Sequence, residues 1–137
     1  MSSTLTAGLV ARLAGDATLT AACPGGVWRY PAPQGITQPF VTVEFSLGRD
    51  EGCGGGTSLT EATYEVVVVA PAAQVATART AAARLQALLD YQQGWSLPGY
   101  RVSGCRRTAP IDQQEEEGTS RWVHIGGEYT LMVEPTA

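Results

Sequence analysis

The sequence has no lysine and no asparagine, and His124 is its only histidine. All nine cationic side chains are arginines, against 13 acidic residues, which gives a net charge of -4 at pH 7. Nucleic-acid binding needs clustered cations to neutralise phosphates, and the only basic pair here is Arg106-Arg107. We therefore do not expect nucleic-acid binding to be the main function.

Cysteines and long apolar runs are also scarce. The three cysteines, Cys23, Cys53 and Cys105, are odd in number and widely spaced, so they match neither a disulfide framework nor a zinc pattern. No apolar stretch is long enough to span a bilayer, and no basic segment precedes an apolar one as in a signal peptide. We expect a soluble, non-secreted protein with reduced thiols, no metal, no cofactor and no membrane contact.

The composition is otherwise that of a globular protein. The chain has 137 residues, of which 44% are hydrophobic and 16% are charged. This length is usual for one domain and is sufficient for one hydrophobic core. We therefore interpret residues 1–137 as a single domain.

The stretch Tyr64–Asp90 predicts a buried strand, a proline break and one amphipathic helix. Val66–Val69 is a run of four β-branched residues, which favours a strand, and Pro71 removes a hydrogen-bond donor and stops it. Apolar residues then recur at helical spacing: Val75, Ala78, Ala82, Leu85 and Leu89, widened by Ala81 and Leu88. The small alanines allow this helix to lie close to the sheet that contains the valine strand.

Shorter patterns predict the elements before this unit. An N-terminal helix carries an apolar stripe (Leu5, Leu9, Val10 and Leu13), and Asp16 resembles the N-cap of a second helical turn. A short strand over 27–30 and a proline-rich loop over 31–39 follow. Residues 40–47 alternate as in a half-buried strand, with Val41, Val43, Phe45 and Leu47 on one face.

Beyond the helix we expect a strand from Tyr100 to Arg106 and a final strand from Ser120 to Val133. In the final strand Val123, Ile125, Tyr129, Leu131 and Val133 alternate with polar residues, and Gly126-Gly127 predicts a bulge or bend. Strands in adjacent pairs on either side of one long helix predict an α+β fold. The sheet is expected to be antiparallel or mixed, with one long and one or two short helices on one face.

Two segments between the predicted strands are expected to be long loops. Gly48–Ser58 is rich in glycine and predicts a mobile loop. Ala109–Thr119 contains Pro110 and an acidic run that is typical of a solvated hairpin tip. An alternative for the acidic run is electrostatic: it would repel DNA from a channel wall or pair with arginines of a neighbouring subunit.

No set of residues in the sequence predicts a catalytic site. A Walker-type phosphate loop ends in Gly-Lys-Ser/Thr and leads into a helix, whereas Gly56-Thr57-Ser58 has no lysine and leads into a strand. Glu128 lies on the same predicted strand as His124, but roughly 13 Å away at the usual rise per residue, which is too far for direct contact. We predict no catalytic residue, and keep a small enzyme as an alternative hypothesis.

The order and spacing of several segments resemble a known family. These segments are LTAGLVARLAGDATLTAAC, VWRYPAPQGITQPFVTVEF, YEVVVVAP followed by the alanine-rich helix with LQALLD, and SRWVHIGGEYTLMVE. Together they are similar to the tail-terminator, or tail-completion, proteins of long-tailed bacteriophages and related tail-like particles. Arg121-Trp122 matches the pair that opens the last strand in that family, whereas Gly52–Gly56 does not match the family pattern.

The resemblance implies a structural virion protein without catalytic residues. Such a protein forms a homohexameric ring on a completed tail tube, stops tube polymerisation and docks the head connector. The implied partners are further copies of the chain, the major tail tube protein and the head-tail connector, with DNA passing through the lumen without sequence-specific binding. The implied location is the tail or neck of the virion, after assembly in the host cytoplasm. Alternatives are a head-completion or neck protein and a regulatory binding module.

We expect subunit or tube contacts in the two predicted loops, because of their length and their position between strands. The candidate contact residues in these loops are Arg49, Asp50, Glu51, Asp112, Glu115, Glu116 and Glu117.

Overall fold

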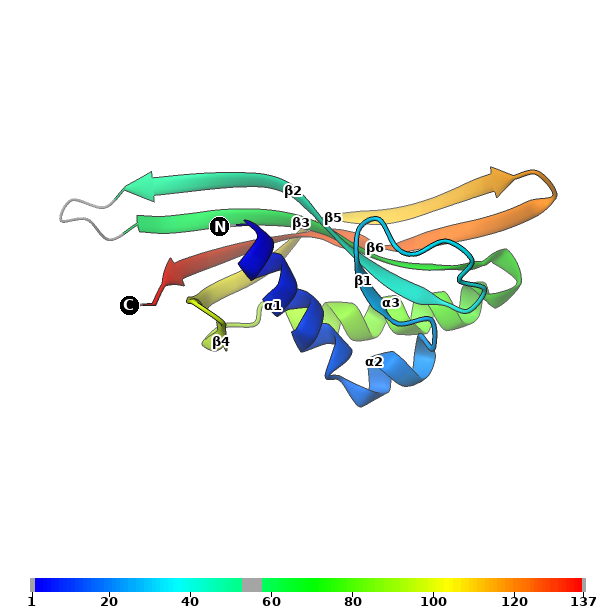
Figure 1. Cartoon of the computed structure of the whole chain (residues 1–137), viewed down its shortest axis with the longest axis horizontal. Coiled ribbons are helices and arrows are strands. Elements are labelled where there is room, and N and C mark those ends of the chain that lie inside the picture. Colours follow the sequence, from blue (N-terminus) through cyan, green and yellow to red (C-terminus); the bar gives the residue numbers. More distant parts are fainter. Residues whose placement is uncertain (1, 53–57, 137) are drawn as a thin grey trace.

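The computed structural model describes residues 2–52 and 58–136, which form a six-stranded sheet with α-helices on one face (Figure 1). The helices are α1 (Ser2–Ala14), α2 (Ala17–Ala22) and α3 (Val75–Leu89), and a short 3₁₀ turn, η1 (Ala72–Gln74), precedes α3. The strands are β1 (Val27–Arg29), β2 (Phe40–Gly52), β3 (Ser58–Pro71), β4 (Trp95–Leu97), β5 (Tyr100–Glu117) and β6 (Ser120–Pro135).

The sheet is mixed, with the strand order β1-β2-β3-β6-β5-β4. Only β1 runs parallel to its neighbour, and the other four strand pairs are antiparallel. The helices gather on one face of this sheet (Figure 1). The predicted α+β fold with helices on one face is therefore confirmed.

The core lies between the helices and the central strands, as the apolar patterns predict. In α3 the buried residues are Ala78, Ala81, Leu85 and Leu89, and in α1 the predicted leucines are fully buried. The central strands contribute Val66 and Val68 from β3, together with alternate residues of β6. Alanines at the contact allow α3 to approach β3 and β6 closely, so this helix covers the two central strands of the sheet.

Asp16 caps α2 and joins it to α3. Its Oδ2 accepts a hydrogen bond from the backbone N–H of Leu19 at 2.9 Å, as predicted for an N-cap. Arg84 on α3 donates to both carboxylate oxygens, at 3.0 and 2.7 Å. Hydrogen bonding by Arg84, and to a smaller extent by the Leu19 backbone, lowers the pKa of Asp16 to about 2. This bidentate pair holds the helical layer together outside the apolar core.

The predicted long loop over Gly48–Ser58 is wrong in its first part. Strand β2 continues to Gly52, which pairs with Ser58 at the start of β3. Residues 53–57 of the predicted loop lie outside the described residues. Glycine disfavours a strand, but the ladder to β3 provides partners for the backbone groups and overrides this preference.

The predicted loop over Ala109–Thr119 is also wrong. Strand β5 continues through Pro110 and the glutamates to Glu117, which pairs with Ser120 on β6. The reversal is a tight turn in which Gly118 has a φ of +60°, a conformation that glycine adopts without strain. Among residues 2–52 and 58–136 no strand is paired with β5 on its outer side at Pro110, so the proline leaves no ladder bond unmade there.

The predicted bulge at Gly126-Gly127 is wrong as well. Both glycines pair in regular register with β3 and with β5, and the register shifts fall elsewhere: at Phe45/Leu47 in β2 and at Val102/Gly104 and Arg107/Ala109 in β5. A Cβ atom at Gly126 would collide with the backbone of Val66 and Val67. This glycine is therefore required by the close approach of β3.

The irregularity in β2 also corrects the predicted alternation of that strand. Val41 and Val43 are buried on the helix side, as predicted. Phe45 pairs with the buried Tyr64, but Leu47 pairs with Thr63, which belongs to the opposite face. Leu47 therefore points away from the helices, although the sequence placed it on the core face.

Candidate functional site

The face of the sheet that the helices leave uncovered is a candidate surface. Side chains alternate between the two faces of a strand, so the neighbours of the buried core residues point to this open face. On β3 these are Glu61, Thr63 and Glu65, followed by the buried Val67 and Val69, and on β6 they include His124 and Thr130. The open face is thus polar along Glu61–Glu65 and apolar beyond it on β3.

Three glutamates form a row across the open face. Glu65 on β3 pairs with Glu44 on β2 and with Glu128 on β6, and all three side chains are half-buried. The Thr108 hydroxyl donates to Glu128 Oε1 at 2.9 Å. Like charges directly opposite one another destabilise a sheet. The row therefore adds negative potential to this face at some cost in folding free energy.

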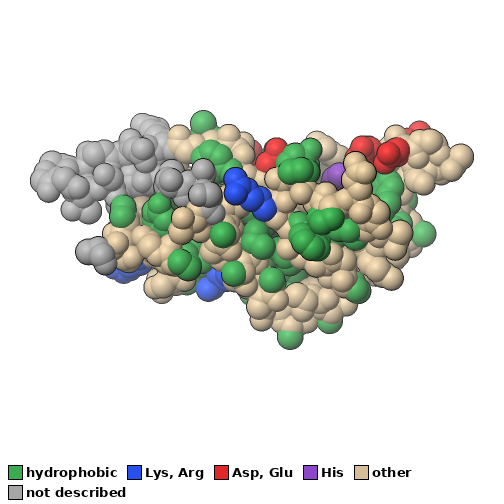
Figure 2. All heavy atoms as spheres, viewed as in Figure 1, with side chains coloured by type: hydrophobic (Ala, Val, Ile, Leu, Met, Phe, Trp, Pro, Cys, Tyr) green, Lys and Arg blue, Asp and Glu red, His purple; other side chains and the backbone are tan. Residues whose placement is uncertain are grey.

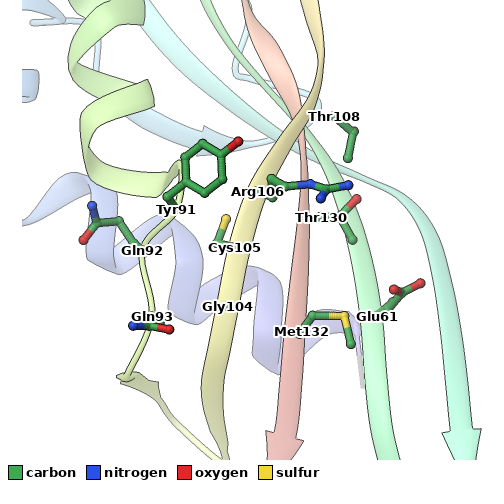
Figure 3. A pocket seen from close by; sticks show the side chains of 10 residues that line it. All are labelled: Glu61, Tyr91, Gln92, Gln93, Gly104, Cys105, Arg106, Thr108, Thr130 and Met132. Carbon is green, nitrogen blue, oxygen red and sulfur yellow. The ribbon is translucent and has the colours of Figure 1, made fainter.

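A groove of about 560 Å³ lies beside this row, near the β5 edge, and we call it the β5 groove (Figure 3). Its labelled side chains come from three neighbouring strands and from the segment after α3 (Figure 3). The residues used below are Tyr91, Arg106 and Met132. Tyr91 has a φ of +57°, which is uncommon for a residue other than glycine, and its side chain is 79% exposed.

The distal end of the β5–β6 hairpin is charged and exposed. His124 Nε2 lies 2.8 Å from Glu115 Oε2, and Arg121 Nε lies 3.3 Å from Glu116 Oε1. The partner of His124 is therefore Glu115 on the neighbouring strand. The sequence alone predicted no partner for this histidine, since Glu128 was too far away along the same strand. Both contacts are at least partly exposed to solvent, so they contribute little to the free energy of folding.

The structure does not bring the predicted contact residues into one cluster. Arg49, Asp50 and Glu51 lie on the far part of β2, where they pair with Glu61, Thr60 and Leu59, and their side chains lie outside what the structure describes. The others (Asp112, Glu115, Glu116 and Glu117) are exposed on β5 near the opposite end of the sheet. The two sets lie on hairpins that extend in opposite directions (Figure 1).

A set of exposed apolar residues lies at the β1–β2 edge, where the sequence patterns did not predict a surface site. Trp28 is 39% exposed, Tyr30 55%, Phe45 37% and Leu47 65%. We call these four residues the edge patch. Figure 2 shows hydrophobic side chains at several places on the surface of the molecule. The alternation of β2 assigned Phe45 and Leu47 to the core, and a sequence pattern gives no signal of where a sheet ends.

The described thiols and acidic groups do not form a reactive site. Burial raises the pKa of Cys23 to about 11 and that of Cys105 to about 12, which disfavours the nucleophilic thiolate. Within residues 2–52 and 58–136 no group of three or more His, Cys, Asp or Glu side chains is placed to hold a metal ion. The helices in this part of the chain are also too short and polar to cross a membrane.

Comparison with known proteins assigns the chain to a family. The model of the family described as "Tail completion protein gp17" matches residues 7–129. The chain belongs to this tail completion family. It is therefore a phage-type tail completion protein and a structural component of a virion tail.

A solved structure shares the fold of this tail completion protein. The matching chain belongs to the structure titled "Virion of native gene transfer agent (GTA) particle". The TM-score is 0.70 at 20% sequence identity, and the match covers 98% of this chain and 99% of that chain. No curated protein matches the sequence. At this identity the structural match shows a common fold and adds no residue-level assignment.

Proposed function

We propose that this tail completion protein forms a closed ring on the end of the tail tube, stops further tube polymerisation and presents the docking surface for the head connector. The ring is hexameric, as the family resemblance implies. Its partners are further copies of the chain, the major tail tube protein and the head-tail connector, and it acts as a single structural domain without catalysis.

One observation carries the proposal: the two long hairpins extend in opposite directions from the helical layer (Figure 1). The β5–β6 end carries the exposed acidic residues Asp112 and Glu115–Glu117, whereas the β2–β3 hairpin ends in a glycine-rich sequence. In a ring whose axis follows the strands, every copy would turn the same hairpin to the same side. Such a ring has two chemically different faces, so one face can match the tube while the other does not.

The candidate contact residues divide between these two faces. Arg49, Asp50 and Glu51 belong to the end formed by β2 and β3, and the acidic residues of β5 belong to the other end. We propose that one set contacts the tube and the other contacts the head connector. Charged rims of this kind steer association and exclude wrong partners.

The open face of the sheet suits the wall of the ring channel. With the helices outside, the row formed by Glu44, Glu65 and Glu128 would face the lumen. Carboxylates repel phosphates, so DNA would pass this wall without a specific contact. Sequence-specific DNA binding would need clustered cations, which the chain lacks, so we propose that this wall only lets DNA pass.

Electron microscopy of lysates tests the function. Phage produced without this gene should give overlong, headless tails beside filled capsids, and expression of the wild-type chain in trans should restore normal tails. The variant Glu115→Gln/Glu116→Gln/Glu117→Gln preserves the hairpin length, and we expect it to restore tails poorly. Tails of normal length beside leaking heads would instead assign the protein to the head side of the joint. Normal particles without the gene would refute the proposal.

A further inference from the structure

The exposed large apolar side chains in the described part of the chain occur in two places only. Four of them form the edge patch, and the fifth, Tyr91, lies at the rim of the β5 groove. Strands β1 and β2 are at one edge of the sheet, and β5 with the short β4 is at the other. Several exposed large apolar side chains at one edge of a soluble protein are typical of an interaction site.

The backbone at both edges is only partly covered. Strand β1 pairs with Val41–Val43 of β2, so within the described residues no strand lies on the outer side of β2 from Glu44 onward. Strand β4 pairs with Tyr100–Val102 of β5. The irregularity in β2 and Pro110 in β5 both discourage direct strand pairing at these edges. Side chains, not a continued ladder, are therefore expected to make the contact.

Leu47 of the edge patch and the β5 groove lie at the same level along the strands. Leu47 pairs with Thr63, Thr63 with Thr130, and Thr130 with Arg106, which lines the groove. A line across the sheet thus joins Leu47 at one edge to the groove near the other, whereas Trp28 pairs with Thr42 and lies further along the strands. A second copy, rotated about an axis along the strands, would bring its patch to this groove without a shift along that axis. Repetition of this contact closes a ring.

The two surfaces are also chemically complementary. The patch wraps around the edge, because Phe45 lies on the helix side and Leu47 on the open side. The groove offers the Tyr91 ring, the Met132 thioether and the Arg106 guanidinium, groups that pack well on aromatic and aliphatic side chains (Figure 3).

The edge patch and the β5 groove also carry opposite charges. Glu44 lies next to Phe45 in β2, and Arg106 lies in the groove. In the described part of the chain neither side chain has an ion-pair partner of its own. Contact between copies would place these two opposite charges close together.

We propose that the edge patch of one copy binds the β5 groove of the next copy, and that this contact is the lateral interface of the ring. The inference rests on the proposed ring and names the surfaces that build it. The interface is heterologous, since the patch and the groove are different surfaces on opposite edges of one sheet. Two patches therefore do not pair with each other.

Three single variants of the full chain test the interface, with assembly measured by light scattering after size exclusion and by mass photometry. Leu47→Arg places a charge in the patch, and Met132→Arg places one in the groove. Ala21→Arg adds the same charge at an exposed position of α2 and is the matched control. Circular dichroism and thermal melts establish that each variant is folded.

We expect the wild type and Ala21→Arg to form the same ring. Leu47→Arg and Met132→Arg should each remain monomeric, with association at least about 30-fold weaker, as for a hot-spot residue. Mixing these two variants should give a one-to-one dimer and nothing larger, because one intact patch and one intact groove remain.

The outcomes separate the interface from the function. A normal ring from folded Leu47→Arg, or no dimer from the mixed variants, would overturn the inference and leave the proposed function standing. A wild-type chain that stays monomeric at every concentration, alone and with purified tail tubes, would refute the ring and the interface together.

Discussion

Gly126 allows the sharpest test of the packing in the sheet. A Cβ atom there would overlap the backbone of β3, at the Val66 carbonyl and 2.7 Å from the Val67 Cα atom. Both are main-chain atoms within a paired strand, so they cannot rotate away as a side chain would. The change Gly126→Ala must therefore separate β6 from β3 or distort the ladder between them.

Two opposing effects decide how Gly126→Ala changes the free energy of unfolding. Replacing glycine by alanine restricts the unfolded chain, which stabilises by about 0.4–1 kcal/mol where the native site accepts a Cβ. Overpacking costs about 1–3 kcal/mol, and the upper end applies because the obstacle is backbone. We expect Gly126→Ala to lower the free energy of unfolding by about 2 kcal/mol and the melting temperature by roughly 5–10 °C.

Gly104→Ala is the matched control. Gly104 also lies within the sheet, on β5 beside a register shift and in the lining of the β5 groove, but a Cβ atom there meets nothing within 4 Å. We expect this variant to be neutral or slightly more stable than the wild type. Urea melts at two protein concentrations give the midpoint and slope for each variant and reveal any contribution from association. Equal stability of the two variants would refute the close approach of β3 at Gly126.

Two further predictions concern ionisable groups. Since the folded pKa of Asp16 is depressed to about 2, its bond to Arg84 stabilises the fold above the unfolded value near 3.8 and is lost as the pH falls towards 2. Melting temperatures of Asp16→Asn, which retains an N-cap acceptor, should depend less on pH between 4 and 2 than those of the wild type; parallel profiles would contradict this. In a Cys53→Ser background, Cys23 and Cys105 should resist a thiol reagent at pH 8 until denaturant is added, because burial raises the pKa of both. Fast labelling of the native protein would contradict their burial.

The sequence determined those parts of the fold that depend on local periodicity. The apolar stripe of α3 and the valine run of β3 are buried as their spacing predicts. Asp16 caps α2 because a short acceptor side chain satisfies the free N–H groups at a helix start, whatever surrounds it. The α+β class follows from the order of these elements, and the family resemblance from the spacing of several segments.

The tertiary structure alone decided how far the strands extend and what meets across them. Glycines in β2 and glutamates in β5 disfavour a strand locally, but the paired neighbours supply their hydrogen bonds and extend both hairpins. Register places His124 next to Glu115, and one irregularity in β2 turns Leu47 to the open face. These contacts join residues that are distant in sequence or depend on a one-residue shift, and a local pattern contains no information on either.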